Sequence, residues 1–452
     1  MTTRDEMRKR LKEDGIEYIL AQFVDLHGAA KCKMVPGSEL DNMIDVGAGF
    51  AGGAVWGSGQ GPHSHDLMGR IDLETYTPLP WLPNTARFAS NIFVDDAPHP
   101  YCPRTNLIRV LDEMRKDGFV LNVGMEPEFF LVTRNDDGSI SPWDPDGIDT
   151  LSKPCYDFRA LAPAMSFLQD LSSGLNGLGW GVYQCDHEDA NGQFEVNFAY
   201  ADALTTADRV TFFKMMTSQL AINYGAIATH MAKPFADRTG SGLHAHFSIA
   251  DAKTGKNACT DKNDKRGLGH SPMGYHFLAG VLHHARALAA ITNPTVNCYK
   301  RLQLGRGLTS SRSGYTWVPA FASYGDNNRT QMIRSAGPGH FEDRTVSAGC
   351  NPYLALAALA AAGWDGVKRK LEPGEPNLGN LYDKSLAEIK ASGIQILPQS
   401  LQEALDCLQK DEVIQHALGP IAGAFLNLKQ QEWETYDRQV SDWEVKQYLT
   451  FF

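Results

Sequence analysis

The stretch Met125-Glu126-Pro127-Glu128-Phe129-Phe130 is the centre around which this 452-residue chain is organised. A hydrophobic run at residues 119–123 leads into it and predicts a β-strand. Side chains two positions apart on a strand share a face, so Glu126 and Glu128 are expected to stand side by side. Two such carboxylates repel unless a cation neutralises them, which favours a hard divalent ion with oxygen ligands. The alternative is a solvated strand face, the commoner origin of a single E-x-E.

The composition is ordinary for a soluble globular protein. Hydrophobic residues make up 43% of the sequence and charged residues 21%. The formal net charge is −11, with acids and bases interspersed, which argues against a nucleic-acid or membrane-surface binder. No signal peptide is recognised after Met1, and no apolar run is long enough to span a bilayer. The eight cysteines are scattered without a C-x-x-C pair, so we expect reduced thiols in a cytoplasmic protein.

Two domains are expected, divided at a proline cluster at residues 98–103. Residues 1–103 predict a small strand-rich domain, and residues 104–452 predict a larger domain in which strands alternate with helices. The fold class is therefore α+β. The longer helices of the second domain are expected at residues 104–117, 205–231, 273–292 and 352–370.

Two downstream segments add further metal-ligating side chains. The segment 186–195 reads D-H-E-D-A-N-G-Q-F-E, and a tight hairpin there would bring Glu188 and Glu195 to one point. In the segment 239–246, T-G-S-G-L-H-A-H, the two histidines share one strand face. A solvated hairpin end and a hydrogen-bonded core histidine are the bland alternatives. Glutamates with few histidines suit Mg²⁺ or Mn²⁺ better than zinc.

Four arginines in loops and strands of this acidic protein indicate an anion site. The guanidinium fork fits both phosphate and carboxylate, whereas surface ion pairs are the alternative for each arginine taken singly. Arginines combined with a divalent ion suit phosphoryl transfer. The sequence contains neither a P-loop motif nor a G-x-G-x-x-G after a strand, which excludes those nucleotide-binding folds. The four are Arg301, Arg329, Arg334 and Arg344.

Taken together, six motifs in this order resemble the glutamine synthetases. The resemblance is close over residues 105–370 and looser elsewhere. It implies a β-grasp-like N-terminal domain, a large α+β catalytic domain, and a dodecamer of two hexameric rings with active sites between subunits. The motifs are E-P-E-F-F (126–130), H-E-x-x-x-G-Q-x-E (187–195), G-S-G-x-H-x-H (240–246), N-P-T-x-N-x-Y-K-R-L (293–302), N-R-x-x-x-x-R (328–334) and C-N-P-Y-L-A-L-A-A (350–358).

The resemblance also implies a role for each matched residue, with two or more Mg²⁺ or Mn²⁺ ions per site. The ligands of one ion would be Glu128, Glu188 and Glu195, and those of the second Glu126, His244 and Glu342. The glutamate site would be Gly240, Arg301 and Arg344. Nucleotide and phosphate contacts would come from His246, Ser248, Arg329 and Arg334, with Arg329 and Glu128 as catalytic residues.

The chemistry implied by the resemblance has two steps. The γ-carboxylate of L-glutamate attacks the terminal phosphate of ATP and gives γ-glutamyl phosphate. An amine then displaces phosphate and forms an amide. Metal ions and arginines would neutralise and position the transferring phosphoryl group, and Arg301 would hold a substrate carboxylate.

The sequence departs from the ammonia-using members where the amine would bind. An N-terminal aspartate of those members is matched by Ala51, and the glutamate of their G-Y-E-A-P segment has no counterpart in the stretch 314–319. The amine pocket is therefore less polar, with Trp56, Trp317 and Phe321 as expected walls. Aromatic walls suit an alkylammonium ion. This favours methylamine as the substrate, as in the γ-glutamylmethylamide synthetase and type III branch.

Several alternatives stay open. The chain could use ammonia, with Asp326 or a residue of a neighbouring subunit replacing the lost acids, or a polyamine. It could also be a non-catalytic binding protein, although the six metal ligands and four arginines are retained. The family's basic residue two positions before the last metal ligand is matched by His340, and its asparagine before Gly240 by Thr239. Tyr382 lies where some relatives carry an adenylylated tyrosine, with an ordinary loop tyrosine as the alternative.

Overall fold

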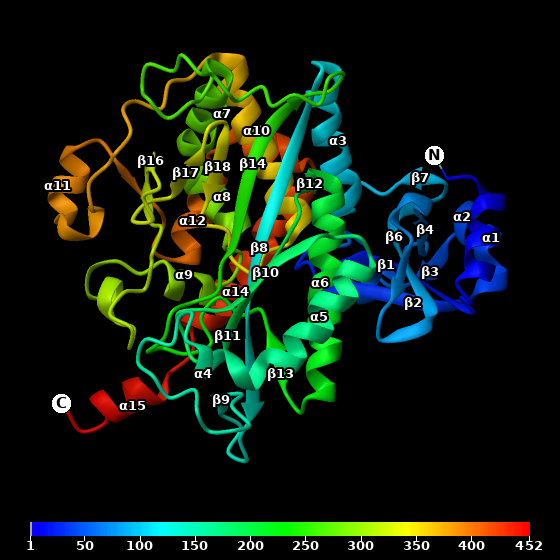
Figure 1. Ribbon diagram of the computed structural model, residues 1–452, viewed down its shortest axis with the longest axis horizontal. Coiled ribbons are helices and arrows are strands. Elements are labelled where there is room, and N and C mark those ends of the chain that lie inside the picture. Colours follow the sequence, from blue (N-terminus) through cyan, green and yellow to red (C-terminus); the bar gives the residue numbers. More distant parts are fainter. Residues whose placement is uncertain (1) are drawn as a thin grey trace.

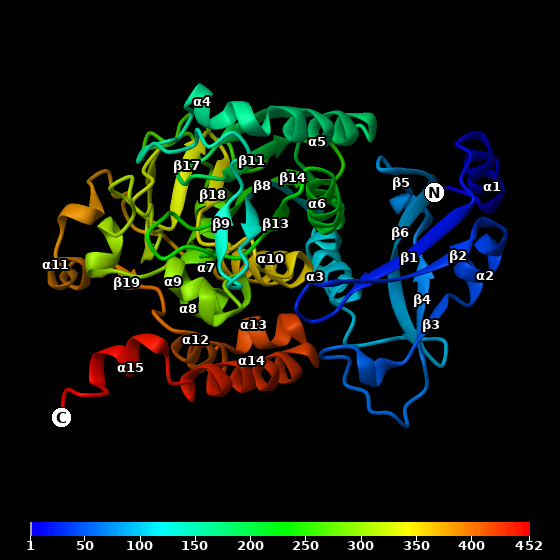
Figure 2. The same cartoon turned by 90° about the horizontal axis from the view of Figure 1, so that it is seen from below.

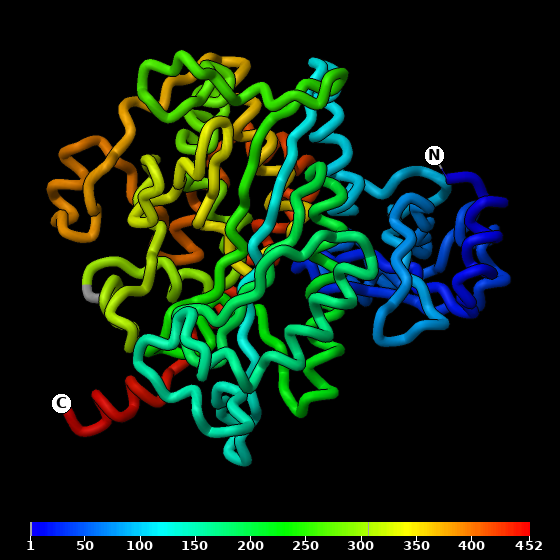
Figure 3. The backbone as a smooth tube through the Cα atoms, viewed as in Figure 1, coloured from blue at the N-terminus to red at the C-terminus, as the bar shows by residue number. Residues whose placement is uncertain are grey.

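The structure is a computed structural model that describes residues 2–452, apart from the side chain of Arg306. A small N-terminal unit lies at one end of the molecule and a larger unit makes up the rest, with the two chain ends on opposite sides (Figure 1; the tube in Figure 3 shows the same path). The α+β class expected from the sequence is confirmed.

The N-terminal unit is built on a seven-stranded sheet with the order β2-β1-β6-β4-β3, in which β5 and β7 also pair with β6. β1 and β6 run parallel, whereas β2 is antiparallel to β1. Helices α1 (Arg4–Glu13) and α2 (Leu40–Asp45) pack apolar side chains into the core of this sheet. The strands are β1 (Tyr18–Val24), β2 (Ala30–Pro36), β3 (Ala48–Phe50), β4 (Leu67–Ile71), β5 (Thr77–Leu79), β6 (Leu82–Val94) and β7 (Ala97–Pro98).

The large unit is built on a ten-stranded sheet with the order β10-β11-β8-β14-β18-β17-β16. Strands β9, β12 and β13 also pair with β8, which runs side by side with β14 through the middle of the molecule (Figure 1). The strands are β8 (Phe119–Arg134), β9 (Ile140–Pro142), β10 (Val182–His187), β11 (Gln193–Phe198), β12 (Ala201–Asp202), β13 (Ile227–Thr229), β14 (Leu243–Asp251), β16 (Tyr324–Asp326), β17 (Ile333–Gly337) and β18 (His340–Asp343); β15 (Phe321–Ala322) and β19 (Gln395–Ile396) form a separate pair.

Helices surround this sheet. α5 lies on one side of the large unit and α12 to α14 on the opposite side (Figure 2). No helix within the described range has the length and apolar character of a membrane span. The helices are α3 (Pro103–Lys116), α4 (Phe158–Leu161), α5 (Met165–Gly177), α6 (Ala203–Asn223), α7 (Pro272–His283), α8 (Ala285–Thr292), α9 (Val296–Arg301), α10 (Pro352–Arg369), α11 (Leu386–Ala391), α12 (Leu401–Leu408), α13 (Glu412–Leu418), α14 (Ile421–Asp437) and α15 (Asp442–Tyr448).

Alternation along β8 and β14 separates the core from the polar face. Val123 and Met125 of β8 and Ala245 and Phe247 of β14 join one buried cluster together with side chains of α3, α7 and α10. Since neighbouring side chains on a strand point to opposite faces, the glutamates and histidines between these apolar residues face away from α3, α7 and α10. The hydrophobic packing of one face thus fixes the direction of the polar groups on the other.

Two expected elements differ from the structure. The helix expected over 205–231 is wrong beyond Asn223, because Gly225 adopts a left-handed backbone (φ +67°) and the chain then pairs with β8 as β13. The helix expected over 273–292 is interrupted at His284, which separates α7 from α8.

The buried guanidinium of Arg104 ties the two units together near the proposed boundary after residue 103. Arg104 of α3 is 3% exposed and donates from Nε and Nη2 to both carboxylate oxygens of Asp208, each at 3.0 Å. The same guanidinium donates to Asn91 at 2.9 Å and to Asp72 at 2.8 Å, both from the N-terminal unit. Fork geometry of this kind fixes orientation as well as contact.

Candidate functional site

A cavity of about 660 Å³ opens on the polar face of the ten-stranded sheet, at the middle of β8 and β14. All six side chains predicted as metal ligands line it, together with all four predicted anion-binding arginines. These ten lining residues are Glu126, Glu128, Glu188, Glu195, His244, Glu342, Arg301, Arg329, Arg334 and Arg344.

Strand register brings these side chains together. In the antiparallel pairing, His244 of β14 lies opposite Glu126 of β8, and Glu195 of β11 lies opposite Glu128. One strand further along, Glu342 of β18 lies opposite His246 of β14. Directly opposed residues have Cβ atoms roughly 5 Å apart. Four strands that are distant in sequence therefore deliver acids and imidazoles to one point.

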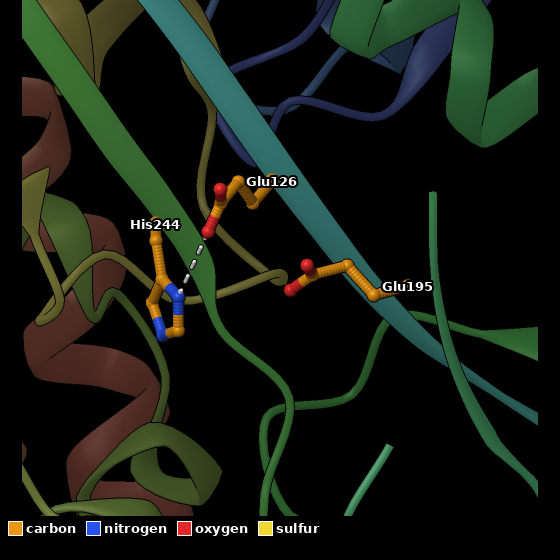
Figure 4. Close-up of side chains that lie close together, drawn as sticks. All are labelled: Glu126, Glu195 and His244. Atoms are coloured by element: carbon orange, nitrogen blue, oxygen red, sulfur yellow. Dashed lines mark ion pairs between the residues drawn. The ribbon is translucent and has the colours of Figure 1, made fainter. Parts of the chain in front are cut away.

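Three groups of side chains could each hold a metal ion, because the ligand atoms within each group lie within 4.8 Å of one another. One group joins Glu126, Glu195 and His244, whose side chains converge from three strands in Figure 4. A second joins Glu126, His246 and Glu342, and a third joins Asp186, Glu188 and Glu195. These groups differ from the two ligand sets expected from the sequence. Glu126 and Glu195 each belong to two groups, and Asp186 and His246 are members that neither expected set contained.

Glu128 is held differently from the other acids. Its Oε2 accepts hydrogen bonds from Gln193 Nε2 and from the backbone N–H of Gly242, both at 2.9 Å. Its Oε1 lies 3.4 Å from His244 Nε2. The side chain is thus oriented by two neutral donors, and its second oxygen points toward the imidazole of His244.

The carboxylates of the third group repel one another. Burial, followed by the charges of Glu128 and Asp186, raises the pKa of Glu188 to about 8. Burial and the neighbouring Glu188 likewise raise the pKa of Glu195, and burial raises that of Asp186. One oxygen of Asp186 is buried without a hydrogen bond among the described residues. Clustered carboxylate oxygens of this kind are the donor set that Mg²⁺ and Mn²⁺ prefer.

The acids on the other side of the site have cationic neighbours instead. Burial alone would raise the pKa of Glu342, but Arg344, 2.8 Å away, and the neighbouring His244 outweigh it and lower the pKa to about 2. Burial of Glu126 is likewise outweighed by His244 and His246, which lowers its pKa. The distance from His246 Nε2 to Glu126 Oε1 is 3.0 Å. The site therefore has a repulsive acidic half and a charge-balanced half.

Arg301 lines the cavity beside Gly240, the glycine predicted to bind glutamate. Its Nη1 donates to the carbonyl oxygen of Thr345 at 3.0 Å and its Nη2 to that of Arg344 at 2.8 Å. A Cβ on Gly240 would lie 2.3 Å from the backbone oxygen of Ala232 and 3.0 Å from the Arg301 side chain. A glycine is therefore required here, and it lets a ligand approach the backbone closely.

A second cavity of about 510 Å³ adjoins the first and shares Glu126 and Tyr183 with it. Its lining includes His246 and Ser248, the two strand residues predicted to contact the nucleotide. His340 also lines it, with Nε2 2.7 Å from His246 Nδ1. The two cavities therefore meet at the side of the acidic centre that carries Glu126.

The residues expected to wall an amine pocket are dispersed. Trp317 lines the main cavity. Trp56 belongs to the N-terminal unit, where it is 60% exposed and meets His27 edge-on, and it is not among the lining residues. Phe321 is 1% exposed and packs in a separate cluster with Leu381. Within one chain, only Trp317 of the three reaches the cavity.

The cavity also contains side chains that sequence reasoning missed. Asp186 lies two positions before Glu188, so the strand period could have placed it near that acid. Asp189 was inside the quoted segment but was given no role. Tyr156, with a left-handed backbone (φ 62°), carried no sequence signal. Tyr382 is fixed by its hydroxyl, which donates to the carbonyl oxygen of Val318 at 2.9 Å.

Comparisons with known proteins agree with this geometry. A sequence model described as the catalytic domain of glutamine synthetase matches residues 100–448. The protein named glutamate–methylamine ligase from Methyloversatilis universalis is 51% identical over 448 residues, which cover 99% of each chain. A protein named glutamine synthetase from Rhizobium meliloti is 41% identical over 434 residues, or 96% of each chain.

Solved structures share the whole fold. The structure described as "GmaS/ADP complex-Conformation 1" has a TM-score of 0.91 at 40% identity and covers 99% of this chain and 100% of its own. The structure described as "Apo GmaS without ligand" has a TM-score of 0.89 at 39% identity, with both chains covered completely. The similarity thus extends over both units.

Proposed function

This chain belongs to the glutamine synthetase family, and on that premise we propose that it is an ATP-dependent ligase that joins the γ-carboxylate of L-glutamate to methylamine. One observation is the main support for ligase chemistry: acids suited to bind metal ions and arginines suited to bind anions line a single cavity. The choice of methylamine is supported by the 51% identity to a protein named glutamate–methylamine ligase over nearly the whole of both chains. The product would be γ-glutamylmethylamide.

The metal ions would be held by the carboxylate groups described above. We assign Glu128, Glu188 and Glu195 to one side of the centre and Glu126, His244 and Glu342 to the other, with Asp186 and His246 as additional ligands. The donor set fits Mg²⁺ or Mn²⁺. Bound there, such ions neutralise charge on the phosphates of ATP and on the carboxylate that attacks them.

The chain's own side chains would position the reacting groups. Arg301 and the backbone at Gly240 hold a carboxylate of glutamate, and Arg344 lies beside them. Arg329 and Arg334 line the same cavity and would stabilise the phosphoryl group as it transfers. The γ-carboxylate oxygen forms a bond to the terminal phosphorus, and ADP leaves. Methylammonium first gives up a proton to a cavity carboxylate or to solvent, and its nitrogen then attacks the γ-carbonyl carbon. Phosphate leaves with the electron pair of the C–O bond, and the nitrogen loses a second proton to phosphate or solvent as the amide forms.

A methyl-substituted amine fits the cavity better than ammonia does. Thr316 is buried and turns its hydroxyl to the carbonyl oxygen of Gly307 at 2.8 Å, so it offers no acid to a small cation. Trp317 follows it and lines the cavity with its indole. An aromatic face attracts the cation and shelters the methyl group from water.

We further propose the dodecamer of two hexameric rings. Its support is the exposed apolar end of the chain: Trp443, Leu449 and Phe451 are at least 62% exposed on or after α15, which extends from the body in Figure 2. Exposed apolar groups of this kind mark a contact surface. A neighbouring N-terminal unit could bring Ala51 and Trp56 to the cavity. Removal of residues 442–452 should lower the molar mass measured by light scattering after size exclusion.

We also propose a cytoplasmic location, supported by eight free cysteines.

Phosphate release measured with purified protein tests the proposed activity. Release should require ATP, glutamate and methylamine together, and mass spectrometry should find γ-glutamylmethylamide. Release with ammonia but not with methylamine would favour glutamine synthesis, the activity in the name of the 41% identical relative. No amine-dependent release would indicate a binding protein.

A further inference from the structure

We propose that Asp189 is the anionic partner of the substrate alkylammonium ion and, with Trp317, forms the specificity subsite for methylamine. The inference rests on the proposed function and names the group that recognises its second substrate. Asp189 has no part in the metal groups or in the glutamate and nucleotide contacts assigned above.

The acids that line the main cavity fall into three sets. Glu126, Glu188, Glu195, Glu342 and Asp186 belong to groups whose ligand atoms lie within 4.8 Å of one another. Glu128 is turned toward His244 by two donors. The remaining acid of the described lining is Asp189. A substrate cation that is not to compete with the metal ions needs a carboxylate outside those groups.

Asp189 is held in one orientation by neutral donors. The hydroxyls of Thr239 and Ser313 both donate to Oδ2. Among the described residues no hydrogen bond uses Oδ1, and no arginine or lysine forms an ion pair with Asp189. Its own backbone N–H donates to Glu188 Oε2 at 3.1 Å. One carboxylate oxygen is thus fixed by the protein and the other is left for a ligand.

The two tethers place Asp189 between glutamate and the amine side of the cavity. Thr239 directly precedes Gly240, which lies against Arg301 at the predicted glutamate site. Ser313 belongs to the loop that carries Trp317, and its hydroxyl oxygen also lies 3.2 Å from the carbonyl oxygen of Tyr315. A cation bound at Asp189 would therefore lie where the loop and the glutamate-binding turn meet.

Trp317 supplies the part of the subsite that distinguishes a methyl group from hydrogen. It has a left-handed backbone (φ 53°), which a bulky residue adopts only when its surroundings hold it there, and it stays 39% exposed while lining the cavity. Tyr315 meets its ring at a centroid distance of 5.8 Å. Ammonium would use the carboxylate alone, whereas methylammonium would use the carboxylate and the indole.

The test compares a charged and an uncharged nucleophile in Asp189→Asn. Asparagine keeps an acceptor for Thr239 and Ser313 but removes the charge. With wild-type protein shown to use methylamine, kcat/KM for methylamine should fall ~10- to 100-fold in the variant, as for the loss of a charge-assisted hydrogen bond. Hydroxylamine, which is uncharged near neutral pH, should form γ-glutamyl hydroxamate within a few-fold of the wild-type rate.

The controls separate recognition from structure. Asp136→Asn, in the exposed turn after β8, should leave both reactions unchanged. Equal losses with hydroxylamine and methylamine in Asp189→Asn would mean that Asp189 only holds the loop, and would overturn the inference. Unchanged kcat/KM for methylamine in Asp189→Asn would also overturn the inference. So would a selective loss of methylamine use in Asp326→Asn when Asp189→Asn shows none. Wild-type protein that does not use methylamine would contradict the proposed function itself.

Discussion

Glu128 of β8 and Glu195 of β11 are direct cross-strand partners in an antiparallel pair. Both are buried, at 5% and 7% exposure, and like charges directly opposite one another destabilise a sheet. Glu188 and Asp186 add to the same cluster and raise the pKa of Glu195 further. This cluster of mutually repelling buried acids is the structural basis of the proposed metal centre.

Metal binding should therefore stabilise the protein measurably. At a hundredfold excess over Kd, Mg²⁺ or Mn²⁺ should add about 2.7 kcal/mol, seen as a rise in Tm by calorimetry or dye binding. Glu195→Gln should make that rise smaller without lowering Tm in chelator, because it removes one metal ligand and one of the repelling charges. A rise of the same size in the variant would exclude Glu195 as a ligand.

Glu128→Gln should lower kcat by roughly 10²- to 10³-fold, the loss typical of removing one electrostatic stabiliser from an active site. The amide keeps an acceptor for Gln193 and Gly242, so circular dichroism and Tm should stay close to wild type. Near-normal turnover would show that Glu128 is a structural residue.

Trp317→Leu should reduce the preference for methylamine over ammonia. Losing the cation–π contact and part of the methyl burial costs about 1.4 kcal/mol, or roughly tenfold in the ratio of the two kcat/KM values. Initial rates with each amine at saturating ATP and glutamate provide the ratio. An unchanged ratio would place the methyl group elsewhere.

His284 predicts a pH-dependent contribution to stability away from the site. Burial alone would lower its pKa, but hydrogen-bond distances of 2.6 Å to Asp411 and 3.1 Å to Asp365 outweigh burial and raise it. A folded-state pKa above the unfolded value of about 6.5 stabilises most below that value, and the contribution is lost as pH rises through the folded pKa. The Tm difference between wild type and His284→Gln should thus be larger at about pH 6 than at about pH 9. A larger difference at the higher pH would contradict the sign.

Local periodicity predicted part of the site correctly. Residues two apart on a strand share a face whatever the tertiary context, so the pairs Glu126/Glu128 and His244/His246 emerge on one polar face as expected. The order of the strands is a tertiary property, and residue spacing did not reveal it. That order places His244 opposite Glu126 and Glu195 opposite Glu128, so the groups cross the expected ligand sets.

The missed features have physical reasons. Phe321 was predicted as a wall of the amine pocket for its aromatic character, but packing sets side-chain direction, and within one chain Phe321 fills a core cluster instead. Trp56 lies on the N-terminal unit, and its place in the amine pocket stays a prediction that depends on a neighbouring subunit. Asp189 looked like one more polar residue at a hairpin end. Its orientation in the cavity is set by hydrogen bonds from Thr239 and Ser313, which are 50 and 124 positions away in the sequence.

Amine competition tests the central claim most directly. The kcat/KM values for ammonia, methylamine, ethylamine and putrescine are measured with glutamate and ATP under identical conditions. The account predicts the highest value for methylamine, because Asp189 holds its charge and Trp317 shelters its one methyl group, while the other acids of the cavity serve the proposed metal centre. A higher value for ammonia would contradict it.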